Sequence, residues 1–179
     1  GARESAPPAS GLPAAPPAAV PETATPPAAR DTLGWTIQLA AYGTLERALA
    51  HADRLSEDIL ALVTPVPQEP GGAGPVWYRV VAGSYRTREA AAAARDTLWR
   101  DGLAPRGIGD LLYAPYSFTL AAGDSVAALR ARALPAVRPA NATVILIGAF
   151  ETREQAAFTQ AALVRAGVRA ALLPRLGTS

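Results

Sequence analysis

Three side chains in the first half of this 179-residue chain carry the groups that sugar recognition needs: the amide of Gln38, the indole of Trp77 and the guanidinium of Arg79. An indole offers a flat apolar face to the C–H face of a pyranose ring. An amide pairs with hydroxyl and acetamido groups, and a guanidinium can bind a carboxylate through two parallel hydrogen bonds. The alternative is that Trp77 and Arg79 only stack on each other on an exposed sheet.

Two segments with alternating hydrophobicity must position these side chains, Trp35–Tyr42 and Val76–Tyr85. Successive residues of a strand point to opposite faces of a sheet. If helices cover the apolar residues of both strands, then Gln38, Trp77 and Arg79 emerge together on the other face. Adjacent strands lie about 4.8 Å apart and alternate residues about 6.6 Å apart, so we expect a single patch.

Further helices and strands surround these two segments. Apolar spacing and turn signals predict a helix at 45–55, a strand at 59–66, an alanine-rich helix at 87–102 and a weaker strand at 103–109. With right-handed crossovers, this order gives an α+β, ferredoxin-like βαββαβ fold: a four-stranded antiparallel sheet with two helices on one face. Strands one and three would lie side by side in the middle, and the other face would be open.

The second half of the chain repeats this order. Residues 76–102 align without a gap with residues 141–167, sharing glycines and a Thr-Arg-Glu triplet. We therefore predict two tandem domains, 33–111 and 113–179, joined by a short link near 112–115. Chance similarity between alanine-rich helices is the alternative, and the fixed spacing of the shared residues argues against it.

The second copy keeps the scaffold but loses the polar side chains. Thr119, Ala142 and Val144 stand where the first copy has its amide, indole and guanidinium. Both faces of the third strand are then largely apolar, which is typical of a strand buried on both sides. We predict that this copy binds no sugar. Its sheet should be covered, by the first copy or by another protein, because an exposed apolar sheet promotes association.

Residues 1–32 have a different composition from the rest. They hold eight of the seventeen prolines and ten alanines but no aromatic residue, so we expect a disordered, extended tether. Such a segment often follows a signal peptide, a transmembrane anchor or a lipidated cysteine, although a disordered tail on a cytosolic protein would look the same. The sequence contains no apolar stretch of about 18 residues that could span a membrane.

The sequence gives little support to catalysis. His51 is the only histidine and cysteine is absent, and no carboxylates cluster at metal-ligand spacing. A nucleophile elbow is missing, nothing favours a two-carboxylate glycosidase, and the glycine-rich 70–75 lacks the lysine of a phosphate loop. We expect no enzyme, no metal and no cofactor. A net charge of +2 without a basic block also argues against nucleic acid.

The segments "IQLAAY" and "WYRVVAGSY" resemble those of the SPOR domain, the sporulation-related repeat of bacterial cell-envelope proteins. The resemblance covers about residues 33–110. It departs at Ala40 and Ala41, where the family usually has glycine and serine, and the missing serine hydroxyl removes one hydrogen-bonding group. The resemblance implies an open sheet that binds peptidoglycan, particularly glycan strands stripped of stem peptides at division sites. The implied ligand contacts are Gln38, Ala41, Trp77, Arg79 and an apolar residue of strand four, which we take as Ile108.

Together these observations favour a non-catalytic peptidoglycan-binding protein of the bacterial periplasm, tethered by an anchor outside this sequence, with cell division as the process in which we expect it to act. Removal of the peptide from N-acetylmuramic acid frees a lactyl carboxylate, and we expect Arg79 to bind it. The alternative is a protein–protein interaction or scaffolding module whose sheet faces bind partner chains. A cell-wall hydrolase would need an active site that this sequence does not offer.

Overall fold

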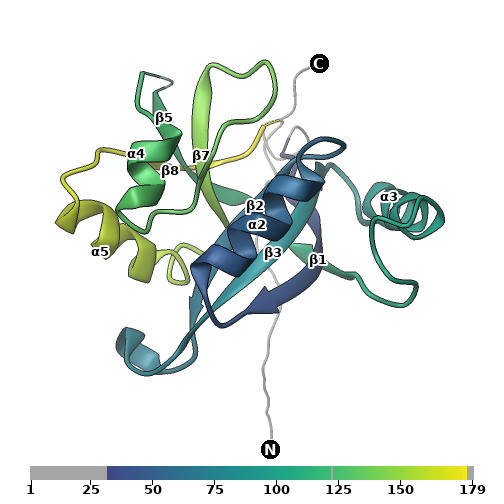
Figure 1. Ribbon diagram of the computed structural model, residues 1–179, viewed down its shortest axis with the longest axis horizontal. Coiled ribbons are helices and arrows are strands. Elements are labelled where there is room, and N and C mark those ends of the chain that lie inside the picture. The colour runs from purple at the N-terminus through teal and green to yellow at the C-terminus, as the bar shows by residue number, and fades with distance from the viewer. Residues whose placement is uncertain (1–31, 122, 177–179) are drawn as a thin grey trace, which may run out of the picture. The chain divides into compact units, whose positions relative to one another are not determined.

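The computed structural model describes residues 32–121 and 123–176 (Figure 1). The expected tether lies outside these residues, apart from Thr32. The described chain contains two four-stranded antiparallel sheets and four α-helices, which confirms the α+β class. Both sheets belong to one compact unit.

The first sheet has the strand order predicted from the sequence. It contains β1 (Trp35–Tyr42), β2 (Ala61–Pro67), β3 (Val76–Tyr85) and β4 (Asp110–Tyr113), in the order β2-β3-β1-β4. Neighbouring strands are antiparallel throughout. Strands one and three therefore lie side by side in the middle of the sheet. A short 3₁₀ turn (Pro70–Gly72) lies in the loop between β2 and β3.

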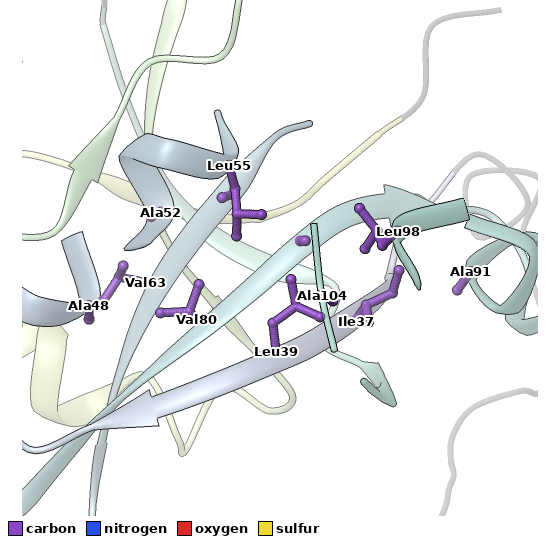
Figure 2. Packing of buried hydrophobic residues seen from close by; sticks show 12 residues of the cluster. Ile37, Leu39, Ala48, Ala52, Leu55, Val63, Val80, Ala91, Leu98 and Ala104 are labelled. Atoms are coloured by element: carbon purple, nitrogen blue, oxygen red, sulfur yellow. The ribbon is translucent and has the colours of Figure 1, made fainter. Parts of the chain in front are cut away.

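Two helices cover one face of this sheet, α2 (Leu45–Leu55) and α3 (Arg88–Arg100). Each begins after a threonine whose hydroxyl accepts a hydrogen bond from a backbone N–H of the first turn, Thr44 for α2 and Thr87 for α3. Their apolar sides pack on alternate residues of the strands, as Figure 2 shows for Leu39 between the two helices. The core consists of Ile37, Leu39, Ala48, Ala52, Leu55, Ala61, Val63, Val80, Ala82, Ala91, Leu98 and Ala104.

The second sheet repeats the order of the first. It contains β5 (Tyr116–Ala121), β6 (Ala136–Val137), β7 (Val144–Phe150) and β8 (Ala171–Pro174), in the order β6-β7-β5-β8. Its helices are α4 (Val126–Ala131) and α5 (Ala157–Arg165). Phe118, Ile145 and Ile147 form a core of their own with these helices. The helix α5 begins later in its copy than α3 does in the first, because residues 151–156 form bends and turns.

One local arrangement occurs in both sheets. Gly83 has a φ of 76° and Gly148 a φ of 74°, in the left-handed region that favours glycine. A Cβ atom at Gly83 would collide with the ring of Tyr85, and one at Gly148 would collide with the ring of Phe150. The same backbone turn and the same aromatic contact thus recur at corresponding places in the two halves.

The fourth strand of the first sheet lies later than predicted. Residues 103–109 form turns and irregular backbone, and β4 runs from Asp110 to Tyr113, so that its end lies in the segment where we expected the link between the halves. The turn segment is attached to α3 instead. The indole N–H of Trp99 donates to the carbonyl of Ile108 at 2.7 Å, and Nη1 of Arg95 donates to the carbonyl of Gly109 at 2.9 Å. These carbonyls therefore bind a helix and not a neighbouring strand.

Candidate functional site

The candidate site lies on the face of the first sheet that points away from α2 and α3. Ile37 and Val80 belong to the core beneath the helices. The residues next to them in sequence, Gln38 and Arg79, therefore point to the opposite face. Trp77 lies one alternate position beyond Arg79 on β3 and so shares this face. This arrangement matches the alternation that the sequence predicted.

A β-bulge adds Ala41 to the same face. Gln38 pairs with Val81, but beyond the register shift Ala41 pairs with Arg79. Without the shift, Ala41 would have the same orientation as Ile37 and point towards the helices. A bulge inserts one extra residue and reverses the alternation after it. The bulge therefore places Ala41 directly beside the guanidinium-bearing residue of β3.

The expectation that this face is open is wrong for the part formed by Leu62, Thr64 and Val81, because the second sheet packs there. An apolar cluster joins Leu62 and Val81 of the first sheet to Val137 and Ala149 of the second, with Ala114 between them. Leu62 and Val81 are at most 2% exposed. The expectation that the first copy covers the apolar sheet of the second therefore describes this contact correctly.

One hydroxyl group strengthens the contact between the sheets. Oγ1 of Thr64 accepts from the backbone N–H of Ala149 at 2.8 Å and donates to the carbonyl of Ala149 at 3.1 Å. The short strand β6 pairs only with Leu146 and Ile147 of β7. Thr64 thus supplies the hydrogen bonds that β6 is too short to give, and buried backbone groups require such partners.

Beside this contact lies a diagonal strip, defined by Gln38, Ala41, Trp77 and Arg79, in which Ala41 and Trp77 are exposed and the two polar residues are partly buried. Trp77 is the most exposed large side chain on it, at 45%. Arg79 lies about 6.6 Å from Trp77 along β3, and Gln38 lies roughly another 6.6 Å farther along the sheet, opposite Val81. The four residues therefore form a single, elongated patch. Such a shape suits an extended ligand with repeating units.

Asp110 marks the β4 end of the strip, where it pairs with Gln38. Ile108, the residue we expected on strand four, precedes the strand and lies in the turn segment attached to Trp99. Its side chain is 44% exposed. The apolar residue of β4 that faces the strip's side of the sheet is Leu112, which packs against the cluster between the sheets.

The guanidinium of Arg79 already has an acidic neighbour. Its Nη1 lies 3.4 Å from Oε1 of Glu151, in the turn after β7. The Arg79 side chain is 19% exposed and that of Glu151 is 40% exposed. Glu151 is 72 residues away in sequence, and because no local pattern connects the two residues, the pair could not be predicted from the sequence.

The second sheet carries no comparable strip. Its positions corresponding to Gln38 and Arg79 are Thr119 on β5 and Val144 on β7, and Ala142 precedes β7. Neither a flat aromatic group nor a guanidinium projects from them. Of the two sheets, therefore, only the first carries an amide, an indole and a guanidinium at these positions within the described residues.

The described residues contain no cluster of side chains suited to hold a metal ion. Within residues 32–121 and 123–176, no three His, Cys, Asp or Glu side chains come together as metal ligands would. His51 lies beside the hydroxyl of Tyr42, with Nδ1 at 3.0 Å from the oxygen. Burial, and secondarily the charge of Arg54, lower the pKa of His51. This histidine is thus engaged on α2, away from the strip.

Comparison with known protein families gives one match. The model of the SPOR domain family matches residues 33–105. No curated protein and no solved structure matches the chain. The matched segment contains the helices α2 and α3, the strands β1, β2 and β3, and all four residues of the strip.

Proposed function

Residues 33–105 of this chain form a SPOR domain, and on this premise we propose that the protein binds the glycan strands of peptidoglycan through the strip of Gln38, Ala41, Trp77 and Arg79. SPOR domains are peptidoglycan-binding, non-catalytic modules of cell-envelope proteins. The single observation that carries the proposal is the half-exposed indole of Trp77 on the face away from the helices. An exposed tryptophan in this position leaves a flat apolar surface available to a sugar ring.

The chemistry of the strip supports a preference for glycan without stem peptides. In N-acetylmuramic acid that carries a stem peptide, the lactyl carboxyl group forms an amide with the peptide, and hydrolysis of this amide leaves a carboxylate. A carboxylate forms charge-assisted hydrogen bonds with a guanidinium that a neutral amide cannot match. We assign this contact to Arg79. The amide of Gln38 would bind hydroxyl or acetamido groups of a neighbouring sugar unit.

We read the second sheet as a degenerate SPOR copy that binds no glycan. The repeated strand order and the paired glycines Gly83 and Gly148 support descent from one unit. Its role is structural, since it supports the first sheet through Thr64 and the cluster around Leu62 and Val81.

The envelope location suggests that residues 1–32 connect this binding unit to an anchor elsewhere, with the binding unit in the periplasm. None of the helices in the described part of the chain has the length and apolarity to cross a membrane. A tethered glycan binder would gather at sites where stripped glycan is produced, and division sites are the natural candidate. Localisation of the fluorescently labelled full-length protein in dividing cells tests this part of the proposal.

Co-sedimentation with purified sacculi tests the binding itself. The wild type should pellet with sacculi, and more of it should pellet after amidase treatment. The triple variant Gln38→Ala/Trp77→Ala/Arg79→Ala should stay in the supernatant. Arg106→Ala serves as the control because it removes an exposed cation outside the strip. Equal pelleting of the wild type and the triple variant would refute the strip as the binding surface.

One structural feature favours a second candidate function, a protein-interaction module. The face that carries the strip already packs against a protein surface, that of the second sheet. A partner chain could extend this contact over Trp77. If neither the wild type nor any variant pelleted with sacculi, this alternative would be supported. The same proteins could then be crosslinked to partner proteins in envelope fractions.

A further inference from the structure

We propose that Glu151, contributed by the second half of the chain, is a built-in competitor for the Arg79 guanidinium and thereby determines how strongly the strip depends on a ligand carboxylate. The inference rests on the proposed glycan-binding function and extends it to a residue outside the SPOR-matched segment. It assigns a role in ligand selection to a half of the chain that lacks a sugar-binding strip of its own.

The geometry of the pair carries the proposal. Oε1 of Glu151 lies 3.4 Å from Nη1 of Arg79, a loose separation for an ion pair, because well-formed charge-assisted bonds are about 2.7–2.9 Å long. The contact involves one nitrogen of a guanidinium that can bind with two. Glu151 is therefore close enough to compete with a second carboxylate but too far to saturate Arg79.

Glu151 is positioned by its own turn. Nε2 of Gln155 donates to Oε1 of Glu151 at 3.0 Å, and the backbone N–H of Glu151 donates to Oε1 of Gln155 at 2.8 Å. These two bonds orient the carboxylate before any ligand arrives. Since the turn begins directly after β7, the packing of the two sheets fixes its distance from the strip.

Two consequences follow for ligands. A ligand carboxylate must displace Glu151 or share the guanidinium with it, and either costs binding free energy through competition or like-charge repulsion. A neutral ligand can leave the ion pair intact. Glu151 thus weakens the binding of stripped glycan selectively, which keeps attachment to the wall reversible.

The experiment compares Glu151→Gln with the wild type in co-sedimentation at low ionic strength. The substitution removes the charge but keeps an oxygen that can accept from Gln155. Glu154→Gln is the matched control, because it removes an exposed carboxylate three residues away in the same turn. The probes are amidase-treated sacculi and the same sacculi after carbodiimide coupling to ammonia, which turns their carboxylates into neutral amides.

We expect Glu151→Gln to bind amidase-treated sacculi roughly two- to fivefold more tightly than the wild type, the scale of a partly exposed ion pair. The gain in affinity should be absent on the amidated sacculi, which lack the ligand carboxylate, and absent in the Arg79→Gln background, which lacks the guanidinium. Added salt should reduce it.

An equal gain in affinity for Glu154→Gln, or a gain that persists without Arg79, would show that only the overall charge matters. Either result would overturn this inference but leave the proposed function intact. Unchanged binding by Glu151→Gln would also overturn it while leaving the proposed function intact. If no variant pellets with any of the sacculi, the proposed function fails and the inference fails with it.

Discussion

Thr64 of the first sheet uses its one hydroxyl group both to accept from the N–H and to donate to the carbonyl of a single residue of the second sheet, Ala149. Both residues are essentially inaccessible to solvent. A strand edge that would otherwise be buried without partners is thereby satisfied by a side chain. The relationship makes the two halves depend on each other for stability.

Thr64→Val should lower the free energy of unfolding by about 1–3 kcal/mol, because it leaves a buried N–H and a buried carbonyl of Ala149 unpaired while preserving shape. Thr64→Ser keeps the hydroxyl and should retain much more of the stability. Denaturant unfolding followed by far-UV circular dichroism measures both. A Thr64→Val protein as stable as the wild type would show that the hydroxyl is dispensable.

Arg175 joins three parts of the chain and should not tolerate lysine. Its Nε donates to Oγ of Ser84 at 3.0 Å, its Nη1 to Oγ of Ser117 at 3.1 Å and its Nη2 to the carbonyl of Leu33 at 3.2 Å. Burial lowers the pKa of Arg175 to about 10, so the group remains charged at neutral pH.

An ammonium group cannot reproduce the fork of these three bonds. Arg175→Lys should therefore cost about 2 kcal/mol of stability, measurable as a lower thermal midpoint. The exposed Arg169→Lys provides the control. Equal midpoints for the two variants would contradict the importance assigned to the fork.

Trp77→Ala and Ile108→Ala should separate the binding strip from general surface hydrophobicity. Both side chains are nearly half exposed, at 45% and 44%, so neither substitution should alter the fold by more than about 0.5 kcal/mol. Loss of the indole should weaken sacculus binding roughly tenfold, the scale of a stacking contact worth about 1–2 kcal/mol. Loss of Ile108, which lies off the strand, should change it less than twofold. Comparable losses of sacculus binding for the two variants would show that Ile108 is part of the binding surface.

The pKa of His51 predicts a pH dependence of stability. Burial and Arg54 lower this pKa below the usual 6.5, so at mildly acidic pH the unfolded chain binds a proton that the folded chain does not. The contribution of His51 to stability is therefore complete above pH 6.5 and declines as the pH falls through that value towards the folded pKa.

Denaturant unfolding at about pH 8 and about pH 5 should show a smaller stability loss for His51→Gln than for the wild type. Comparing the two proteins removes the contribution of the carboxylates, which are common to both. Identical losses would show that the histidine titrates alike in the folded and unfolded chains.

The local sequence pattern was sufficient to predict the two central strands of the first sheet. Alternation in the two segments predicted both strands and the face that Gln38, Trp77 and Arg79 share, and the order of elements with right-handed crossovers predicted that the strands are adjacent. Alternation alone does not explain why Ala41 faces the strip, because the bulge reverses it. The family pattern pointed to Ala41 without supplying this physical reason.

Nonlocal contacts account for what the sequence did not predict. Residues 103–109 were expected to be extended, but their carbonyls bind Trp99 and Arg95, side chains of the preceding helix. The pair of Arg79 and Glu151 depends on how two separately patterned sheets pack, and periodicity within either half contains no information on that packing.

The position of Gln38 on β1 gives the protein a mechanical property. A pull on Thr32 first loads its bridge to Leu176 and then reaches β1, which is the strand that carries Gln38 and lies between β3 and β4. With glycan bound along the strip, which crosses β1 and β3 diagonally, part of the load would run along β1. The hydrogen bonds that join β1 to its two neighbours would then be loaded in shear, so that many of them resist the force together. A strand peeled from the edge of a sheet, in contrast, would lose its hydrogen bonds one after another.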